Sequence, residues 1–190
     1  MIATINALLP AWLQEEMTKS GALYGDEEAR MRYAITLARR NVVEGTGGPF
    51  GAALFEAHSG RLVSVGVNLV VASNCSHAHA EMVAIALAEQ ALGSYTLADL
   101  EEGPYALYTS CEPCVMCLGG ILWSGVGRVV SGARDADARA IGFDEGPKPD
   151  NWAEALRGRG IEVFEEFCRD EAVAVLRDYA ESGGIIYNGC

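Results

Sequence analysis

Several features are missing from this chain of 190 residues. No uninterrupted apolar run reaches the length of a membrane-spanning helix, and Met1-Ile2-Ala3 opens no basic, signal-like segment. Internal repeats and low-complexity segments are absent as well. Hydrophobic residues make up 50% of the chain, which argues against disorder over most of it. We therefore expect one cytoplasmic domain with a substantial core and no membrane partner.

Basic residues are scarce. Lys and Arg number 14 against 26 Asp and Glu, which gives a formal net charge of −12. Proteins bind nucleic acids mostly by neutralising phosphates with Lys and Arg, so this balance disfavours a polyanionic partner. A local basic groove stays compatible with it. The charge predicts an enzyme that acts on a small molecule.

The six cysteines do not resemble a disulfide framework. Cys111, Cys114 and Cys117 fall within seven positions, a density typical of metal binding. Without a secretory signal, the other cysteines are expected to be reduced thiols. These are Cys75, Cys168 and Cys190.

Hydrophobic periodicity predicts strands that alternate with helices. Strands are expected at residues 50–55, 61–67, 105–109, 126–130 and 161–164. Helices are expected within 1–20, after Asp26, and at 80–92, 113–123 and 170–182, with Pro113 in the first turn. This alternation is typical of a three-layer αβα sandwich. We expect a single domain over 1–190, with an N-terminal helical extension (about 1–24) and a C-terminal tail (about 183–190).

Two short motifs carry the chemistry. His79-Ala80-Glu81 precedes Pro113-Cys114-Val115-Met116-Cys117. One imidazole and two thiolates are three protein ligands for Zn²⁺, and a catalytic zinc site keeps its fourth position for water. Cys114 and Cys117 are three residues apart, so they share one face of a helix. This H-x-E and P-C-x-x-C pair is the signature of zinc-dependent nucleobase deaminases.

Glu81 is predicted to move protons at this site. A zinc ion lowers the pKa of bound water from about 15.7 toward about 7. A carboxylate two residues from the His ligand can take a proton from that water, deliver it to a ring nitrogen and help protonate departing ammonia.

Other kinds of metal site could use some of the same residues. A structural zinc would need a fourth protein ligand, which Cys111 or His77 could supply, but Glu81 would then have no purpose. An iron–sulfur site would continue to a fourth Cys followed by Pro, and Leu118-Gly119-Gly120 stands there instead. A non-catalytic zinc-stabilised module is the remaining alternative.

The sequence resembles the cytidine deaminase-like superfamily, and within it the guanine deaminase branch. Three segments carry the resemblance, which spans about residues 30–147: Pro49-Phe50-Gly51-Ala52, Ala78-His79-Ala80-Glu81 and Thr109 to Gly120. The resemblance implies a central five-stranded mixed sheet flanked by helices, with zinc between two helix starts. It also implies a homodimer that exchanges its C-terminal segment.

The resemblance further implies how a purine base would be held. Asn68 matches the base-binding Asn of the family. Glu145, in the Ile141–Pro147 segment, would be a second catalytic or substrate-binding acid, with Asp144 as its rival. A carboxylate accepts well from the N1–H and the amine of guanine. A solvated acidic loop is the simpler interpretation of both residues.

Aromatic residues could complete the site. Phe50 and Trp123 could stack on the base, although both could equally be core aromatics. The resemblance makes Tyr187 and Asn188 candidates for a lid. Taken together, we expect hydrolytic deamination of guanine to xanthine and ammonia, a step of purine metabolism. A tRNA adenosine deaminase and a cytosine or nucleoside deaminase are the alternatives.

Overall fold

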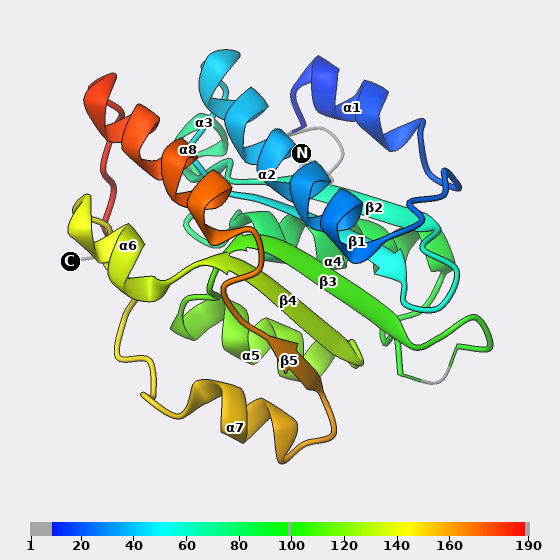
Figure 1. Cartoon of the computed structure of the whole chain (residues 1–190). Coiled ribbons are helices and arrows are strands. Elements are labelled where there is room, and N and C mark those ends of the chain that lie inside the picture. The colour runs from blue at the N-terminus through cyan, green and yellow to red at the C-terminus, as the bar shows by residue number, and fades with distance from the viewer. Residues whose placement is uncertain (1–8, 99, 189–190) are drawn as a thin grey trace.

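The computed structural model describes residues 9–98 and 100–188 (Figure 1). Its strands form one mixed sheet in the order β2-β1-β3-β4-β5. β1 pairs antiparallel with β2 and β3, whereas β3, β4 and β5 run parallel. The bounds are β1 (Gly51–Glu56), β2 (Leu62–Val67), β3 (Tyr105–Cys111), β4 (Arg128–Ala133) and β5 (Glu162–Phe164). The five-stranded mixed sheet of the predicted fold is confirmed.

Helices cover both faces of this sheet, as Figure 1 shows. One face carries α1 (Ala11–Met17), α2 (Glu27–Val43) and α8 (Arg169–Glu181); the other carries α4 (Ala80–Leu92), α5 (Val115–Ser124) and α7 (Trp152–Arg157). Two short helices, α3 (Val70–Ser73) and α6 (Asp135–Ala140), lie in the connections. Side chains of β1 alternate between the two layers: Ala53 and Phe55 join the first core, Ala52 and Leu54 the second.

The described part of the N-terminal segment packs into the first core. Pro10 is the N-cap of α1, as its fixed φ allows, and Trp12 and Leu13 are buried. Residues 1–8 of the predicted extension and 189–190 of the predicted tail lie outside the described residues. Within the described ranges, no helix is long and apolar enough to cross a membrane.

The start of α4 is placed by an unusually close approach to β2. A Cβ on Gly66 would lie 2.1 Å from the Ala80 carbonyl oxygen and 2.5 Å from the Ala84 nitrogen. Only glycine therefore lets the α4 backbone lie directly on this strand. The contact fixes the position of His79, the N-cap residue of α4, relative to the sheet.

The start of α5 differs from the prediction. The helix begins at Val115, because Cys114 is an extended N-cap residue with φ −67° and ψ 172°. Pro113 lies before the helix rather than in its first turn. The chain thus turns at Cys114, and both metal-site helices begin directly after a proposed ligand, His79 for α4 and Cys114 for α5.

Candidate active site

His79, Cys114 and Cys117 meet where α4 and α5 begin. The His79 Nδ1 atom lies 3.5 Å from Cys114 Sγ and 3.6 Å from Cys117 Sγ. The three ligand atoms all lie within 4.8 Å of one another. Cys114 and Cys117 are buried and His79 is half-buried. Sequence motifs on different elements are thus brought to one point.

These distances fit a tetrahedral zinc ion. Zn–S bonds of about 2.3 Å and Zn–N bonds of about 2.0–2.1 Å place S and N about 3.6 Å apart at tetrahedral angles. The two observed S–N separations match this value. Two thiolates and one neutral imidazole also balance the charge of Zn²⁺. Zinc binding is a trait of the family, and these residues are positioned to hold the ion.

The metal-free thiols have very different proton affinities. The pKa of Cys114 falls to about 4, mainly because the Cys117 thiol hydrogen-bonds to it, and His79 adds to the effect. The pKa of Cys117 is raised by that same interaction and by burial. One thiolate is therefore already formed, and the second proton has to leave when zinc binds.

Glu81 lies in the first turn of α4 beside the ligand triad. Its Oε2 atom is 3.5 Å from Cys117 Sγ, and the residue is only 6% exposed. Burial, and then the negative charge of Cys114, raises the pKa of Glu81 in the metal-free chain. A bound cation adds positive charge here and favours the carboxylate. A carboxyl group with these opposing influences is suited to accept and return a proton.

A cavity of about 390 Å³ opens on the triad and Glu81. Glu145 and Asp144 both line it, but only Glu145 is buried. Burial raises the pKa of Glu145 to about 8, and the charges of Cys114 and Glu81 contribute. The Asp144 carboxylate instead accepts from Arg139 at 3.2 Å and from the Gly146 amide at 2.9 Å. The geometry favours Glu145 as the acid that faces a ligand.

Asn68 and the C-terminal tail also line the cavity, the tail through Tyr187 and Asn188. Asn68 is 1% exposed, and its Oδ1 accepts from the Val70 amide. A Cβ on Gly48 would lie 3.0 Å from the Tyr187 hydroxyl and 3.3 Å from Asn68 Oδ1. The absence of a side chain at Gly48 thus gives both polar groups room beside the same backbone. Burial raises the pKa of Tyr187, so its hydroxyl stays protonated.

The aromatic predictions have different outcomes in the structure. Phe50 lines the cavity, and its ring lies 5.0 Å from that of Phe143 in an edge-to-face contact. Trp123 does not join them: it is 88% exposed and is not among the cavity-lining residues. The buried face of α5 carries Cys117 and Ile121, which directs Trp123 toward solvent. The structure gives no support to Trp123 as a wall of the cavity.

Some lining residues were not predicted. Phe143 also contacts the Tyr187 ring at 5.2 Å, and Glu112 and Met116 reach the cavity. Phe143 directly precedes Asp144 and Glu145 in the Ile141–Pro147 segment. The sequence could therefore have indicated that Phe143 lines the cavity. His77 lies on the surface, 3.4 Å from the Cys75 sulfur and apart from the triad.

Comparison with known proteins places the chain in a family. The profile of the cytidine and deoxycytidylate deaminase zinc-binding region matches residues 25–133, more than half of the sequence. The chain belongs to this deaminase family. Its matched region contains all three ligands and Glu81, and the predicted resemblance is confirmed.

Guanine deaminases are among its relatives. The guanine deaminase of Bacillus subtilis is 43% identical over 120 residues, which are 63% of this chain and 72% of that protein. A solved structure of guanine deaminase from Nitrosomonas europaea is 44% identical, with a TM-score of 0.88 over 91% of this chain and 94% of that one. Another solved structure, a complex with 2,6-diaminopurine, is 45% identical and has a TM-score of 0.90. The match covers 97% of this chain and 98% of that one.

Proposed function

We propose that this chain hydrolyses guanine to xanthine and ammonia. The observation that carries the proposal is the three-ligand triad with Glu81 placed 3.5 Å from Cys117. Three protein ligands suit a catalytic site, and a buried carboxylate beside them suits proton transfer. The guanine deaminases among the relatives supply the substrate class.

Glu81 would carry protons through the reaction. A zinc ion held by His79, Cys114 and Cys117 would lower the pKa of a water molecule. Glu81 would take a proton from the water as its oxygen adds to C2 of guanine, and pass that proton to N3. It would then take the proton of the new C2 hydroxyl and give it to the amine, which leaves as ammonia as the C2–N bond breaks and the C2 carbonyl forms. Burial of Glu81 keeps bulk water from competing for these protons.

Recognition of the base would use several residues that line the cavity. We propose that Asn68 hydrogen-bonds one edge of the purine and that Glu145, ionised once a bound cation offsets the charge of Cys114, accepts from the N1–H and amine edge. Phe50 would contact the flat face of the ring, which its place in the cavity lining supports. Tyr187 would cover the base from the tail, which leaves less room for a ribose or an RNA strand. A free base is therefore the proposed substrate.

We also propose that the chain forms a homodimer, as predicted from the sequence. The exposed apolar side chains of α5 support it: Val115 is 38%, Leu122 41% and Trp123 88% exposed. Exposed apolar side chains that gather on one helix favour association. Light scattering after size exclusion would measure the mass, and a Trp123→Glu variant would be monomeric. Exchange of the tail between subunits and the cytoplasmic location stay predictions.

Ammonia release from a substrate panel tests the proposed activity. The panel holds guanine, guanosine, adenine, cytosine, cytidine and a tRNA anticodon stem-loop, each offered to zinc-loaded protein. Selective release from guanine is the expected result. Release only from the stem-loop would replace the proposal with tRNA adenosine deamination. Zinc binding without release from any substrate would indicate a non-catalytic module.

A further inference from the structure

A buried cation stands next to the acidic loop, outside the proton-transfer site. Lys148 and Lys19 are the only lysines of the sequence. The Lys148 side chain is only 6% exposed, whereas that of Lys19 is 51% exposed. Lysine is rarely buried unless it is paired. The burial of Lys148 therefore indicates that acidic partners offset its charge.

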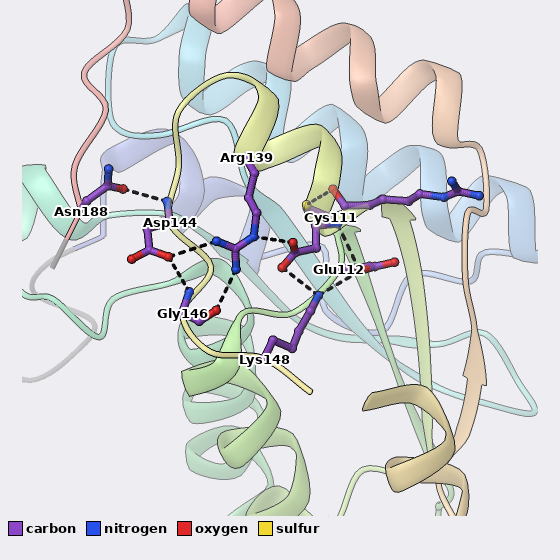
Figure 2. A network of polar contacts seen from close by, with 9 residues as sticks. Cys111, Glu112, Arg139, Asp144, Gly146, Lys148 and Asn188 are labelled. Carbon is purple, nitrogen blue, oxygen red and sulfur yellow. Dashed lines mark hydrogen bonds and ion pairs between the residues drawn. The ribbon is translucent and has the colours of Figure 1, made fainter. Parts of the chain in front are cut away.

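Lys148 ties together three segments (Figure 2). Its Nζ lies 2.9 Å from Glu112 Oε2 and 3.2 Å from Asp135 Oδ1, and 5.2 Å from the Trp152 ring. Glu112 lies two residues before the ligand Cys114, and Asp135 begins α6. The Glu112 carboxylate also accepts from the Asp135 amide at 3.1 Å. Lys148 thus links the metal-ligand loop to the acidic loop and to α6.

The partners of Lys148 depend on it. Asp135 Oδ1 is buried and has no hydrogen-bond partner in the described chain; the Lys148 charge offsets it at 3.2 Å, while Arg139 pairs with Oδ2 at 2.6 Å. Burial alone would lower the pKa of Lys148, but the hydrogen bond and charge of Glu112 and the charge of Asp135 outweigh it and raise the pKa. The ammonium stays charged, and removing it would leave the largely buried Glu112 carboxylate without a cation and Asp135 with Arg139 alone.

Further contacts hold the same loop in place. The Glu145 carbonyl accepts from the Val115 amide at 3.1 Å, directly after Cys114. Arg139 donates to the Gly146 carbonyl at 2.7 Å, and Gly146 itself has a φ of +73°. In Figure 2 the Arg139 side chain extends from α6 toward Asp144 and Gly146. Lys148 and its ion-pair partners, Glu112 and Asp135, hold the part of the loop that follows Glu145.

We propose that Lys148 is a positioning residue of the reaction, which bridges Glu112 and Asp135 and thereby fixes the loop that places Glu145 in the cavity. The inference rests on the proposed function, since it assigns Lys148 a part in the same deamination. Lys148 contacts no residue of the ligand triad and is not among the cavity-lining residues. Its effect passes through the position of Glu145 relative to Cys114.

Lys148→Met tests the inference, because methionine keeps most of the length and removes the charge. We expect the variant to bind as much zinc as the wild type, and kcat for guanine to fall about 10- to 100-fold, the cost of a catalytic group displaced by about 1 Å. KM also rises, since Glu145 binds the base, but by less than kcat falls, because Asn68 and the metal site are intact. Lys19→Met is the matched control and leaves both constants unchanged.

A double variant separates positioning from charge balance. Lys148→Met combined with Glu112→Gln removes one of the carboxylates that Lys148 neutralises. We expect the double variant to melt at a higher temperature than Lys148→Met. Its kcat should stay low, because Glu112→Gln does not restore the link between the metal-ligand loop and the loop that carries Glu145. Recovery of kcat together with stability would overturn the positioning role. So would loss of zinc in Lys148→Met, because the metal would then explain the lost turnover.

The two proposals fail in different ways. A wild-type protein that releases no ammonia from guanine contradicts the proposed function, whatever Lys148 does. An active wild type with an equally active Lys148→Met variant overturns the inference alone. Acylation with an amine reagent, followed by mass spectrometry, checks the geometry without turnover. Lys19 should be modified at least tenfold faster than Lys148, and equal labelling would contradict the buried cluster.

Discussion

Asn41→Ala should weaken both folding and substrate binding, because this side chain holds the backbone beneath the cavity. Asn41 is fully buried near the end of α2. Its Nδ2 donates to the Gly48 and Asn68 carbonyls, both at 2.8 Å, and its Oδ1 accepts from the Thr46 hydroxyl at 2.7 Å. Thr46 in turn accepts from Trp12 of α1 at 3.1 Å.

The size of the effect follows from what each partner retains. Among the described residues, the Asn68 carbonyl has no hydrogen bond other than that from Asn41, so the variant leaves it unpaired. Gly48 keeps the bond from the Phe50 amide, and Thr46 keeps a longer one to the Asn41 carbonyl. One unpaired buried carbonyl costs about 1–3 kcal/mol and two weakened bonds about 0.5–1.5 kcal/mol each, or about 2–6 kcal/mol in all.

Two assays measure the consequences. Chemical denaturation of the zinc-loaded protein reports the change in free energy of unfolding. Steady-state kinetics should show KM for guanine rising about tenfold, because 1.4 kcal/mol of lost binding corresponds to that factor. Asn151→Ala is the control, since Asn151 is exposed and makes no capping hydrogen bond. It should change neither quantity.

An Asn41→Ala variant with wild-type stability and wild-type KM would refute this reasoning. A loss of stability with unchanged KM would be equally informative. It would mean that the side chain of Asn68 keeps its place without the support of its own carbonyl. The KM effect also contrasts with the kcat effect expected for Lys148→Met, so the two supports of the cavity can be told apart.

Three further variants test other parts of the molecule. Glu81→Gln should retain zinc and lose at least about 100-fold in ammonia release, and turnover near the wild-type rate would exclude Glu81 as the proton carrier. Cys117→Ser should bind less than one zinc per chain by metal analysis and melt earlier. Burial favours neutral Glu16, but hydrogen bonds from Lys19 and Tyr33 outweigh it and lower its pKa. The difference in free energy of unfolding between the wild type and Glu16→Gln should therefore be largest at neutral pH and vanish as the pH falls through the lowered pKa. Chemical denaturation at several pH values measures this difference.

Local patterns predicted the main elements because each carries its own signal. The period-two pattern of residues 62–67 and the thirteen-residue run from Ala80 to Leu92 are long enough to define their type. The helices α6 and α7 escaped prediction because six residues make fewer than two turns. Such short helices depend on tertiary contacts rather than on periodicity.

The metal triad was predictable and the rest of the site less so, for a physical reason. The ligands sit in compact motifs whose chemistry is specific at any position in a fold. The direction of Trp123 depends on the rotation of α5 about its axis, which an apolar sequence such as Ile121-Leu122-Trp123 leaves open. The link from Lys148 to Glu112 joins residues far apart in the chain, and only the folded chain brings them together.

The order of the chain separates metal capture from substrate enclosure. All three ligands and Glu81 lie between residues 79 and 117, whereas the cavity wall is completed only by Phe143, Glu145 and, near the end, Tyr187. On the ribosome, the ligand set is therefore complete well before the residues that enclose a base have been made. A protease that cut the exposed 181–183 segment would likewise leave a zinc protein with an open cavity. Zinc content alone would not distinguish such a chain from the intact enzyme.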